Sequence, residues 1–253
     1  MNDILMTDEQ LKMVNIYNYV VNPEDVDAHR NFRLTSLEGV LLNAAGRAAD
    51  DRNCGAFELI DSEGVTWVLL KLAIEMEQIP KEKETITIKT WVEYTNRLLS
   101  VRNFLVYNQA GVVIGSASSD WSLIDISTRR PVDILSETGI EDHSNGVRVP
   151  ASLPGKLRPE ENPDAFVSHT VAYSDIDYNG HVNSMKYVQW MLDSYPVDRI
   201  YSSSVALFEV SYLHEAMHGQ NVTVRHKTDG DQTFFSVRSD EGEDFVRARI
   251  FWK

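Results

Sequence analysis

The chain of 253 residues is long enough for one large domain or two of ordinary size, and its 43% hydrophobic residues can supply a core for either. A formal net charge of −14 argues against a nucleic-acid-binding role, because phosphates need a basic surface. The single cysteine, Cys54, excludes an internal disulfide framework and a cysteine-rich metal site. We find neither a run of ~18 apolar residues nor a signal-peptide pattern, so we expect a cytoplasmic protein without a membrane span or targeting segment.

The first half of the chain is predicted to form one strand, one long helix and four further strands. Residues 16–21 have strand composition, and an apolar stripe with helical spacing predicts a helix over 35–50, with Thr35 and Glu38 at capping-box spacing. The acidic stretch between them, which contains Asp25, Asp27 and His29, is interpreted as a solvated loop. Segments rich in β-branched and aromatic residues predict strands over 65–76, 84–95, 99–108 and 112–124.

The second half repeats this order of elements. A surface linker is predicted over 133–163, where Ser, Gly, Pro, Glu and Asn accumulate. It is followed by a strand over 166–173, a polar turn, a helix over 182–195 and strands near 205–213, 222–228, 233–239 and 246–252. A helix covered by an antiparallel sheet, present twice, predicts an α+β protein with two similar domains packed as an internal pseudo-dimer. We interpret only the second copy as carrying a catalytic group of Asp, Asn and His before its helix, so we expect one copy to catalyse and the other to shape the cavity.

Residues 173–196 hold the densest group of chemically capable side chains. Asp175, Asp177, Asn179 and His181 alternate, so an extended backbone would project all four to one side. The dipeptide Asn179-Gly180 is also a strong turn signal. An interpretation of these acids as solvated residues around a hairpin therefore fits the sequence about as well as a catalytic one. The following helix, with Asn183 or Ser184 as N-cap and Pro196 as its stop, places the cluster near unpaired backbone N–H groups that favour developing negative charge.

Several segments of the chain resemble the acyl-acyl carrier protein thioesterases of plants and bacteria, which are built as tandem hot-dog domains. The sequence SDIDYNGHVN at 174–183 resembles the family motif SDxDxNxHVN, and TWVLLKLAIEME at 66–77 and SSDWSLIDISTRRPV at 118–132 also resemble family segments. The resemblance implies a double hot-dog fold. It implies an N-terminal domain over 10–134 that holds the acyl cavity and sets specificity, a linker over 135–163, and a catalytic C-terminal domain over 164–253.

Carried over residue by residue, the resemblance implies four catalytic positions: Asp177, Asn179, His181 and Glu215. Glu215 is found through the family's YxxE pattern, since strand periodicity alone leaves it as a solvated residue. Many plant members have cysteine at the next position, and Ala216 excludes a cysteine mechanism there. We expect Asp177 to act as base or nucleophile, Asn179 to position the substrate, His181 to orient or transfer protons, and Glu215 to activate water. Backbone N–H groups of residues 182–184 are expected to bind the oxyanion, with no metal or cofactor.

The resemblance thus implies hydrolysis of acyl-acyl carrier protein, which releases a free fatty acid and ends chain elongation. Three alternatives stay open: an acyl-CoA thioesterase of the same fold, a hot-dog hydratase or dehydratase, and a non-catalytic acyl-binding module. The cavity is expected to be set by Leu37, Leu41, Ala45, Trp67 and Leu69.

The implied partner, acyl carrier protein, is acidic as a family, so a local basic face is expected on this acidic chain. The available cations are Lys71, Lys89, Arg97, Arg102, Arg129, Arg130, Lys186 and Arg199. The paired arginines 129 and 130 are interpreted as structural. Because the internal duplication already supplies one pairing of domains, a monomer and a homodimer are both compatible with the sequence.

Overall fold

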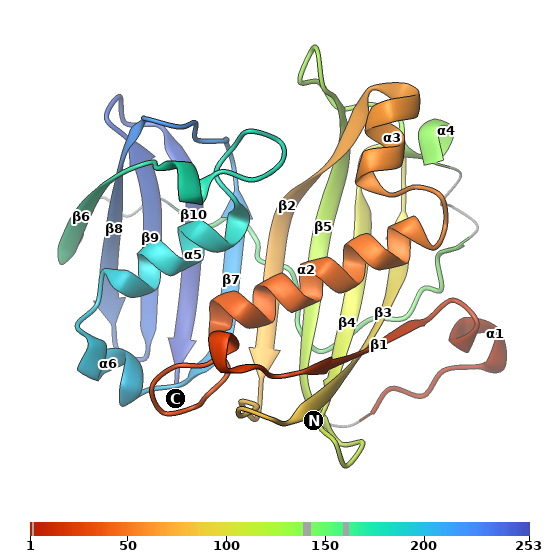
Figure 1. Cartoon of the computed structure of the whole chain (residues 1–253), viewed down its shortest axis with the longest axis horizontal. Coiled ribbons are helices and arrows are strands. Elements are labelled where there is room, and N and C mark those ends of the chain that lie inside the picture. Colours follow the sequence, from red (N-terminus) through yellow and green to blue (C-terminus); the bar gives the residue numbers. More distant parts are fainter. Residues whose placement is uncertain (2, 139–142, 159–161) are drawn as a thin grey trace.

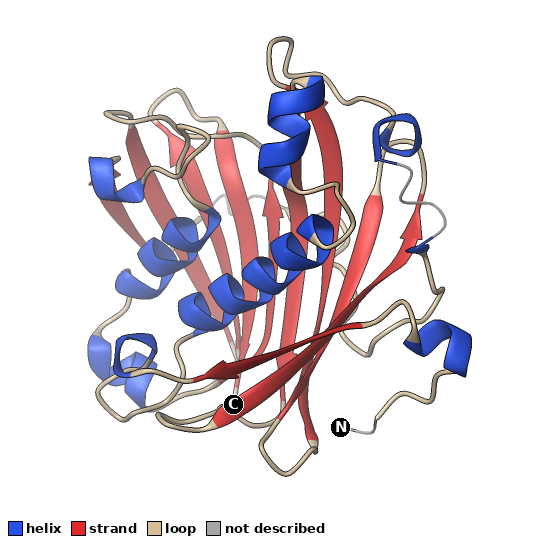
Figure 2. Cartoon of the chain, turned by 45° about the vertical axis from the view of Figure 1, so that its right-hand side comes forward, coloured by secondary structure: helices blue, strands red, loops and turns tan. Residues whose placement is uncertain are grey.

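The protein is built on one antiparallel sheet with two helices lying on the same face of it (Figure 1, Figure 2). The computed structural model describes residues 1, 3–138, 143–158 and 162–253. The sheet has ten strands in the order β1-β3-β4-β5-β2-β7-β10-β9-β8-β6. Each half of the chain contributes a long helix and five strands, as the sequence predicted, so the fold is α+β.

The first half contains these elements: α1 (Asp8–Leu11), β1 (Asn15–Val20), α2 (Leu34–Asp50), α3 (Ala56–Glu63), β2 (Val65–Met76), β3 (Thr85–Thr95), β4 (Ser100–Tyr107), β5 (Val113–Asp125) and α4 (Ile134–Thr138). The second half contains β6 (Ala165–Thr170), α5 (Ser184–Asp193), α6 (Val197–Tyr201), β7 (Val205–Tyr212), β8 (Asn221–Asp229), β9 (Gln232–Ser239) and β10 (Asp244–Trp252). Short 3-10 turns, Pro23–Asp25 and Tyr173–Asp175, precede the two long helices. No helix in the described ranges is long and apolar enough to cross a bilayer.

The two halves are joined along the centre of the sheet. Strand β2 pairs with β7 in antiparallel register from Lys71 opposite Ser211 to Glu75 opposite Leu207. On the helical face, α2 contacts α5, and a Cβ added at Gly39 of α2 would lie only 2.5 Å from Sδ of Met185. Because glycine has no side chain, the Met185 side chain can occupy this space where the two helices meet. The two copies therefore share one continuous hydrophobic core.

Helix α2 buries the predicted apolar stripe but does not begin with the predicted capping box. Its N-cap is Arg33, which makes no side-chain cap hydrogen bond. Glu38 does not reach back to the helix start; it is completely buried where α2 faces the second half. The capping-box prediction is therefore wrong. The spacing matched, but the carboxyl of Glu38 has a tertiary partner in Tyr212 instead.

Four short helices of the described residues and part of the linker differ from the sequence predictions. The sequence patterns did not reveal α1, α3, α4 or α6, and Pro196 serves as the N-cap of α6 directly after α5. The segment 143–158 is not simply a surface loop. It packs on the sheet, with Ala151 buried and its N–H donating to Ser116 Oγ at 3.1 Å. Positions 139–142 and 159–161 of the predicted linker lie outside the described residues.

Candidate active site

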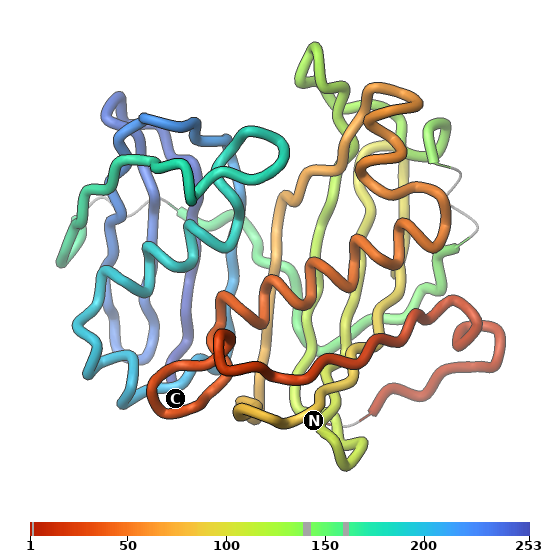
Figure 3. The backbone as a smooth tube through the Cα atoms, in the orientation of Figure 1, coloured from red at the N-terminus to blue at the C-terminus, as the bar shows by residue number. Residues whose placement is uncertain are grey.

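Asp177 to His181 form a tight turn that projects from the second half toward α3 of the first (Figure 3). The N–H of Asp177 donates to the carbonyl of His181 at 2.8 Å, and the N–H of Gly180 donates to the carbonyl of Asp177 at 3.1 Å. Gly180 has φ +81°, a left-handed conformation that favours glycine. Asp177 Oδ1 accepts the N–H of Asn179 at 2.8 Å. The turn interpretation and the catalytic interpretation of these residues are therefore compatible.

Asp175 lies behind this turn and not beside the other polar residues, so the four side chains do not project to one side as they would from an extended backbone. Its side chain is buried, and Oδ2 accepts the N–H of Ala172 at 2.8 Å and lies 3.0 Å from Nε2 of His169. Lys186 Nζ lies 3.8 Å from the other oxygen. Burial opposes ionisation of Asp175, but these partners outweigh burial and lower its pKa. Asp175 therefore anchors the base of the turn.

Glu215 connects His181 to the first half of the chain. Its Oε1 lies 3.5 Å from Nδ1 of His181, and its Oε2 forms an ion pair with the guanidinium of Arg129. Nδ1 of His181 is buried and has no hydrogen-bond partner in the described structure. A small movement of the Glu215 carboxylate would complete this bond, and long catalytic hydrogen bonds are common before substrate binds. Arg129 of the TRRP segment lies just beyond the end of β5 and forms an ion pair, as the structural interpretation expects, and its partner is a carboxylate of the candidate site.

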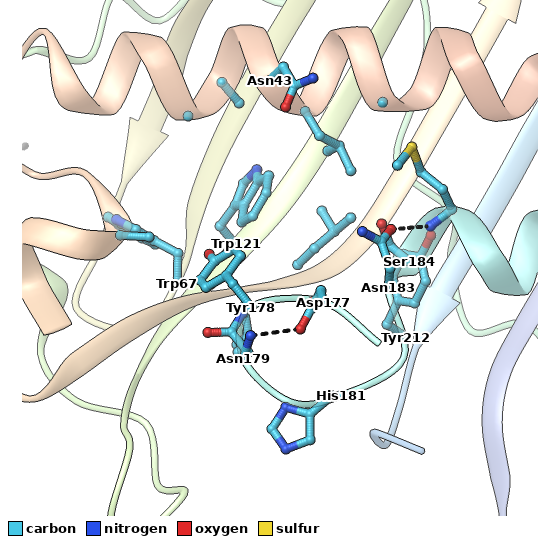
Figure 4. Close-up of a pocket in the computed structure, with 18 of the residues that line it drawn as sticks. Asn43, Trp67, Trp121, Asp177, Tyr178, Asn179, His181, Asn183, Ser184 and Tyr212 are labelled. Carbon is cyan, nitrogen blue, oxygen red and sulfur yellow. Dashed lines mark hydrogen bonds between the residues drawn. The ribbon is translucent and has the colours of Figure 1, made fainter. Parts of the chain in front are cut away.

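The turn opens on a pocket of about 730 Å³ that both halves line. Asp177, Asn179 and His181 come from the second half, while Asn43, Trp67 and Trp121 come from α2, β2 and β5 of the first (Figure 4). Tyr178 at the tip of the turn contacts Phe57 of α3, with ring centroids 4.8 Å apart. The polar turn therefore lies beside a cavity whose walls are largely supplied by the other half.

The cavity wall agrees with the sequence prediction at three of five positions. Ala45, Trp67 and Leu69 line the pocket. Leu37 and Leu41 do not; both are buried in the core. One helical face cannot serve the sheet and the pocket at once, and Leu42, Asn43 and Gly46 face the pocket in their place.

Two of the expected oxyanion donors are already in use. The N–H of Val182 donates to the carbonyl of Ala216 at 3.0 Å, and the N–H of Asn183 donates to the carbonyl of Asp175 at 2.8 Å. Asn183 Oδ1 also accepts the N–H of Met185 as the N-cap of α5. The prediction is therefore wrong for Val182 and Asn183, whose N–H groups hold the fold of the turn. The side chain of Asn179 is exposed at the turn and lines the pocket.

Comparison with protein families identifies both halves. The acyl-ACP thioesterase N-terminal domain matches residues 12–140, and the acyl-ACP thioesterase C-terminal domain matches residues 160–253. The chain belongs to the acyl-ACP thioesterase family. An acyl-ACP thioesterase from Bacteroides thetaiotaomicron is 30% identical, with a TM-score of 0.87 over 96% of this chain and 99% of that one.

Plant members of the acyl-ACP thioesterase family are similar as well. The 12:0-ACP thioesterase from Umbellularia californica has a TM-score of 0.84 at 19% identity, covering 95% of this chain and 97% of that one. An acyl-[acyl-carrier-protein] hydrolase of Cuphea viscosissima is 26% identical over 74% of this chain and 48% of its own length. This chain spans about half the length of such curated relatives. The double hot-dog fold predicted from the sequence is confirmed.

The first half of this acyl-ACP thioesterase family member carries a turn of the same construction, which the sequence reading missed. The N–H of Asp27 donates to the carbonyl of Asn31 at 3.0 Å, and Asp27 Oδ1 accepts the N–H of His29 at 2.8 Å. Asp25 is buried at its base, so the solvated-loop interpretation is wrong for that residue. The corresponding pairs are Asp25 and Asp175, Asp27 and Asp177, His29 and Asn179, and Asn31 and His181. The polar turn is thus present twice, with His and Asn exchanged.

The two turns differ in what lies beside them. His29 packs edge-on against Tyr201 of α6, with ring centroids 4.6 Å apart. Below α5, Tyr195 stacks on His226 and contacts Phe235 and Trp252. Ala45, the α2 residue that corresponds to Tyr195, instead lines the pocket. Aromatic rings therefore fill the space in the second half that small residues leave open in the first.

Proposed function

We propose that this protein hydrolyses acyl thioesters of acyl carrier protein and releases free fatty acid, ending chain elongation. The observation that carries the proposal is the 730 Å³ pocket, partly lined by apolar side chains, into which the Asp177–His181 turn opens. A cavity of this size suits an acyl chain. The family membership of both halves supports the same chemistry. In this proposal the N-terminal half holds the acyl chain and the C-terminal half supplies the catalytic groups.

The mechanism assigns each candidate residue a role that its position supports. In one route Asp177 removes a proton from a water whose oxygen bonds to the thioester carbonyl carbon; in the other, the Asp177 carboxylate itself bonds to that carbon, and the anhydride left after loss of the thiolate is hydrolysed by a water that Glu215 activates. In both routes the carbonyl oxygen becomes an oxyanion. Asn179 donates its amide to that oxygen. As the C–S bond breaks, His181, oriented by Glu215, gives a proton to the leaving thiolate and later regains one that the attacking water has released, so that the acid and the thiol are the products. Ala216 offers no nucleophile, and its carbonyl is used by Val182.

The carrier protein is proposed to dock near the mouth of the pocket. Arg102 is buried and drops out of the predicted basic face. Arg97 pairs with Asp133, and Lys186 lies against Asp175, so these charges are partly neutralised. Arg130 is exposed beside Arg129, next to the site, and is the strongest candidate contact.

Thiol release from a panel of acyl-carrier thioesters and matched acyl-CoA thioesters tests the activity. We expect Asp177→Ala to lower kcat by about 10²-fold or more, and Asn179→Ala by about 10²- to 10³-fold. Asp27→Ala is the matched control, because it removes the equivalent hydrogen bonds from the first-half turn, whose residues do not line the pocket. Equal losses in Asp27→Ala and Asp177→Ala would contradict the assignment. Faster turnover of the CoA esters, or a change in enoyl absorbance without thiol release, would favour the alternative enzymes.

Salt dependence tests the partner. If docking is electrostatic, the KM for acyl-carrier substrate rises with ionic strength, while the KM for an acyl-pantetheine lacking the protein does not. Arg130→Glu should raise the KM for the carrier substrate alone. Lys89→Glu, whose ammonium lies over the Tyr107 ring on β4, is the control. An unchanged KM in Arg130→Glu would place the docking face elsewhere.

A further inference from the structure

A buried carboxyl from the first half lies between the two segments that carry the candidate site in the second half. Glu38, on α2, has no exposed surface. Its Oε1 accepts the hydroxyl of Tyr212 at 2.9 Å, while Oε2 is buried and has no hydrogen-bond partner. Burying a carboxyl group without a full set of hydrogen-bond partners destabilises the folded state, so a glutamate at this position is unexpected on grounds of stability alone.

The first segment beside Glu38 is the start of α5, where a Cβ added at the neighbouring Gly39 would lie 2.5 Å from Sδ of Met185. The Ser184 hydroxyl lowers the pKa of the Glu38 carboxyl and that of Tyr212, against the larger effect of burial. Ser184 is the first residue of α5 and follows His181 by three positions. Its side chain and that of Tyr212 both reach the pocket wall (Figure 4). A shift of Ser184 would therefore be passed directly to the turn that carries His181.

The second segment is the end of β7. Tyr212 is the last residue of β7 and precedes Glu215 by three positions. Behind it, the hydroxyl of Tyr187 on α5 accepts the N–H of Ala216 at 3.0 Å, and the rings of Tyr187 and Tyr212 lie 6.3 Å apart. Glu38 thus meets both segments, one leading to His181 and the other to Glu215.

We propose that Glu38 is a positioning residue of the site: its carboxyl holds the start of α5 and the end of β7 together, and so sets the distance between His181 and Glu215. The role rests on the proposed function, since it places groups for that reaction. Catalytic groups depend steeply on such placement, and a misplacement of about 1 Å can cost about 10²-fold in rate.

The protonation of Glu38 fits this role. Burial raises its pKa to about 7, with the Tyr212 and Ser184 hydroxyls opposing the rise. Burial and the Glu38 carboxyl raise the pKa of Tyr212 well above its ordinary value, and Tyr187 on α5 adds to the rise. Below about pH 7 the neutral acid can accept from Tyr212 and donate its own proton to a neighbouring hydroxyl. A glutamine has the same donor and acceptor and no charge at any pH.

Three variants test the proposal: Glu38→Ala, Glu38→Gln and Val40→Ala. Val40 is buried on the same helix and contacts the core, so its variant controls for lost stability. We expect Glu38→Ala to lower kcat about 10- to 100-fold with KM changed less than about 3-fold. We expect Glu38→Gln to keep the wild-type kcat near pH 6. Above about pH 7, where Glu38 ionises, we expect the kcat of the wild type to fall and that of Glu38→Gln to stay unchanged. Val40→Ala should lower the Tm and keep kcat.

Two outcomes would overturn the proposal: a wild-type kcat in Glu38→Ala, or a Glu38→Gln variant that is as impaired as Glu38→Ala. A readout without turnover separates this from the proposed function. In a crystal structure of Glu38→Ala we expect the His181 and Glu215 side chains to lie farther apart than in the wild type. If the wild-type protein releases no thiol from any thioester, the proposed function fails, while an unchanged His181–Glu215 distance would refute the positioning role by itself.

Discussion

Nδ1 of His181 lies 3.5 Å from Oε1 of Glu215, and the other oxygen of the same carboxylate forms an ion pair with Arg129 of the first half. The ion pair fixes one oxygen of Glu215 and leaves the other directed at the imidazole. Arg129 and Glu215 are each about two-fifths exposed, with side-chain exposures of 39% and 40%. Water screens such a pair, so its contribution is to orientation more than to stability.

Replacing Arg129 is expected to impair catalysis without unfolding the protein. Arg129→Gln frees the Glu215 carboxylate, and we expect kcat/KM to fall about 10-fold, with Tm nearly unchanged because exposed pairs contribute little. Arg129→Lys should recover only part of the rate, since an ammonium lacks the planar fork of a guanidinium. Arg97→Gln, which breaks the exposed pair with Asp133, is the control. Full activity in Arg129→Gln would show that Glu215 needs no orientation from the first half.

Substitutions on α2 should change the acyl chain length that the enzyme prefers. Ala45→Phe places a ring in the pocket, where the corresponding Tyr195 already fills the second half, so long chains should lose kcat/KM relative to short ones. Leu42→Ala enlarges the same wall and should shift the preference toward longer chains. Competition assays with mixed acyl-carrier thioesters measure both shifts. Changes of the same sign in the two variants would contradict this assignment of the wall.

The buried carboxyl of Glu38 should make stability depend on pH. Its pKa of about 7 in the folded protein lies above the ordinary 4.5, so the folded state binds more protons between these values. The contribution of Glu38 to the free energy of unfolding is therefore highest below about pH 4.5. It falls by a total of about 3 kcal/mol as the pH rises from there through 7. Urea unfolding of wild type and Glu38→Gln across this range measures it. The difference between the two proteins should grow with pH; a constant difference would contradict the shifted pKa.

Two glycines on α2 should respond oppositely to the same substitution. A Cβ at Gly46 meets no atom within 4 Å, so Gly46→Ala should stabilise the helix by about 0.5–1 kcal/mol. A Cβ at Gly39 would lie 2.5 Å from Met185 Sδ, so Gly39→Ala must displace α5 or Met185 and should gain nothing or lose stability. Thermal unfolding of the two variants makes the comparison. Equal gains in Tm would show that the helices do not need their close approach.

The regular elements could be predicted because local sequence determines them. The first-half strands follow runs of β-branched and aromatic residues, and α2 follows a stripe that the sheet buries. The short helices α3 and α6 hold too few turns to show a period. At Glu38 the local spacing predicted a capping box with Thr35, whereas the hydrogen-bond partner in the structure is Tyr212, 174 residues away.

The site was only partly predictable for the same reason. Asp177, Asn179 and His181 are neighbours along the chain, so a motif could reveal them. The pair of Arg129 and Glu215 joins residues 86 positions apart, and no local pattern connects them. The equivalence of the turn at Asp27 was hidden because His and Asn are exchanged and the following helix residues differ. Comparing the halves position by position from their shared Asp-x-Asp spacing would have found it.

The shared core between α2 and α5 and the aromatic rings below α5 explain why both copies reside in one chain. In a homodimer of identical subunits, a tyrosine that closes one cavity would close the other, and a histidine placed for chemistry would appear on both sides. When both copies are in one chain, this constraint is removed, because the side chains of one copy can change to leave an open cavity while those of the other change to carry reactive groups. Both copies line the same pocket, so neither half by itself carries its whole wall.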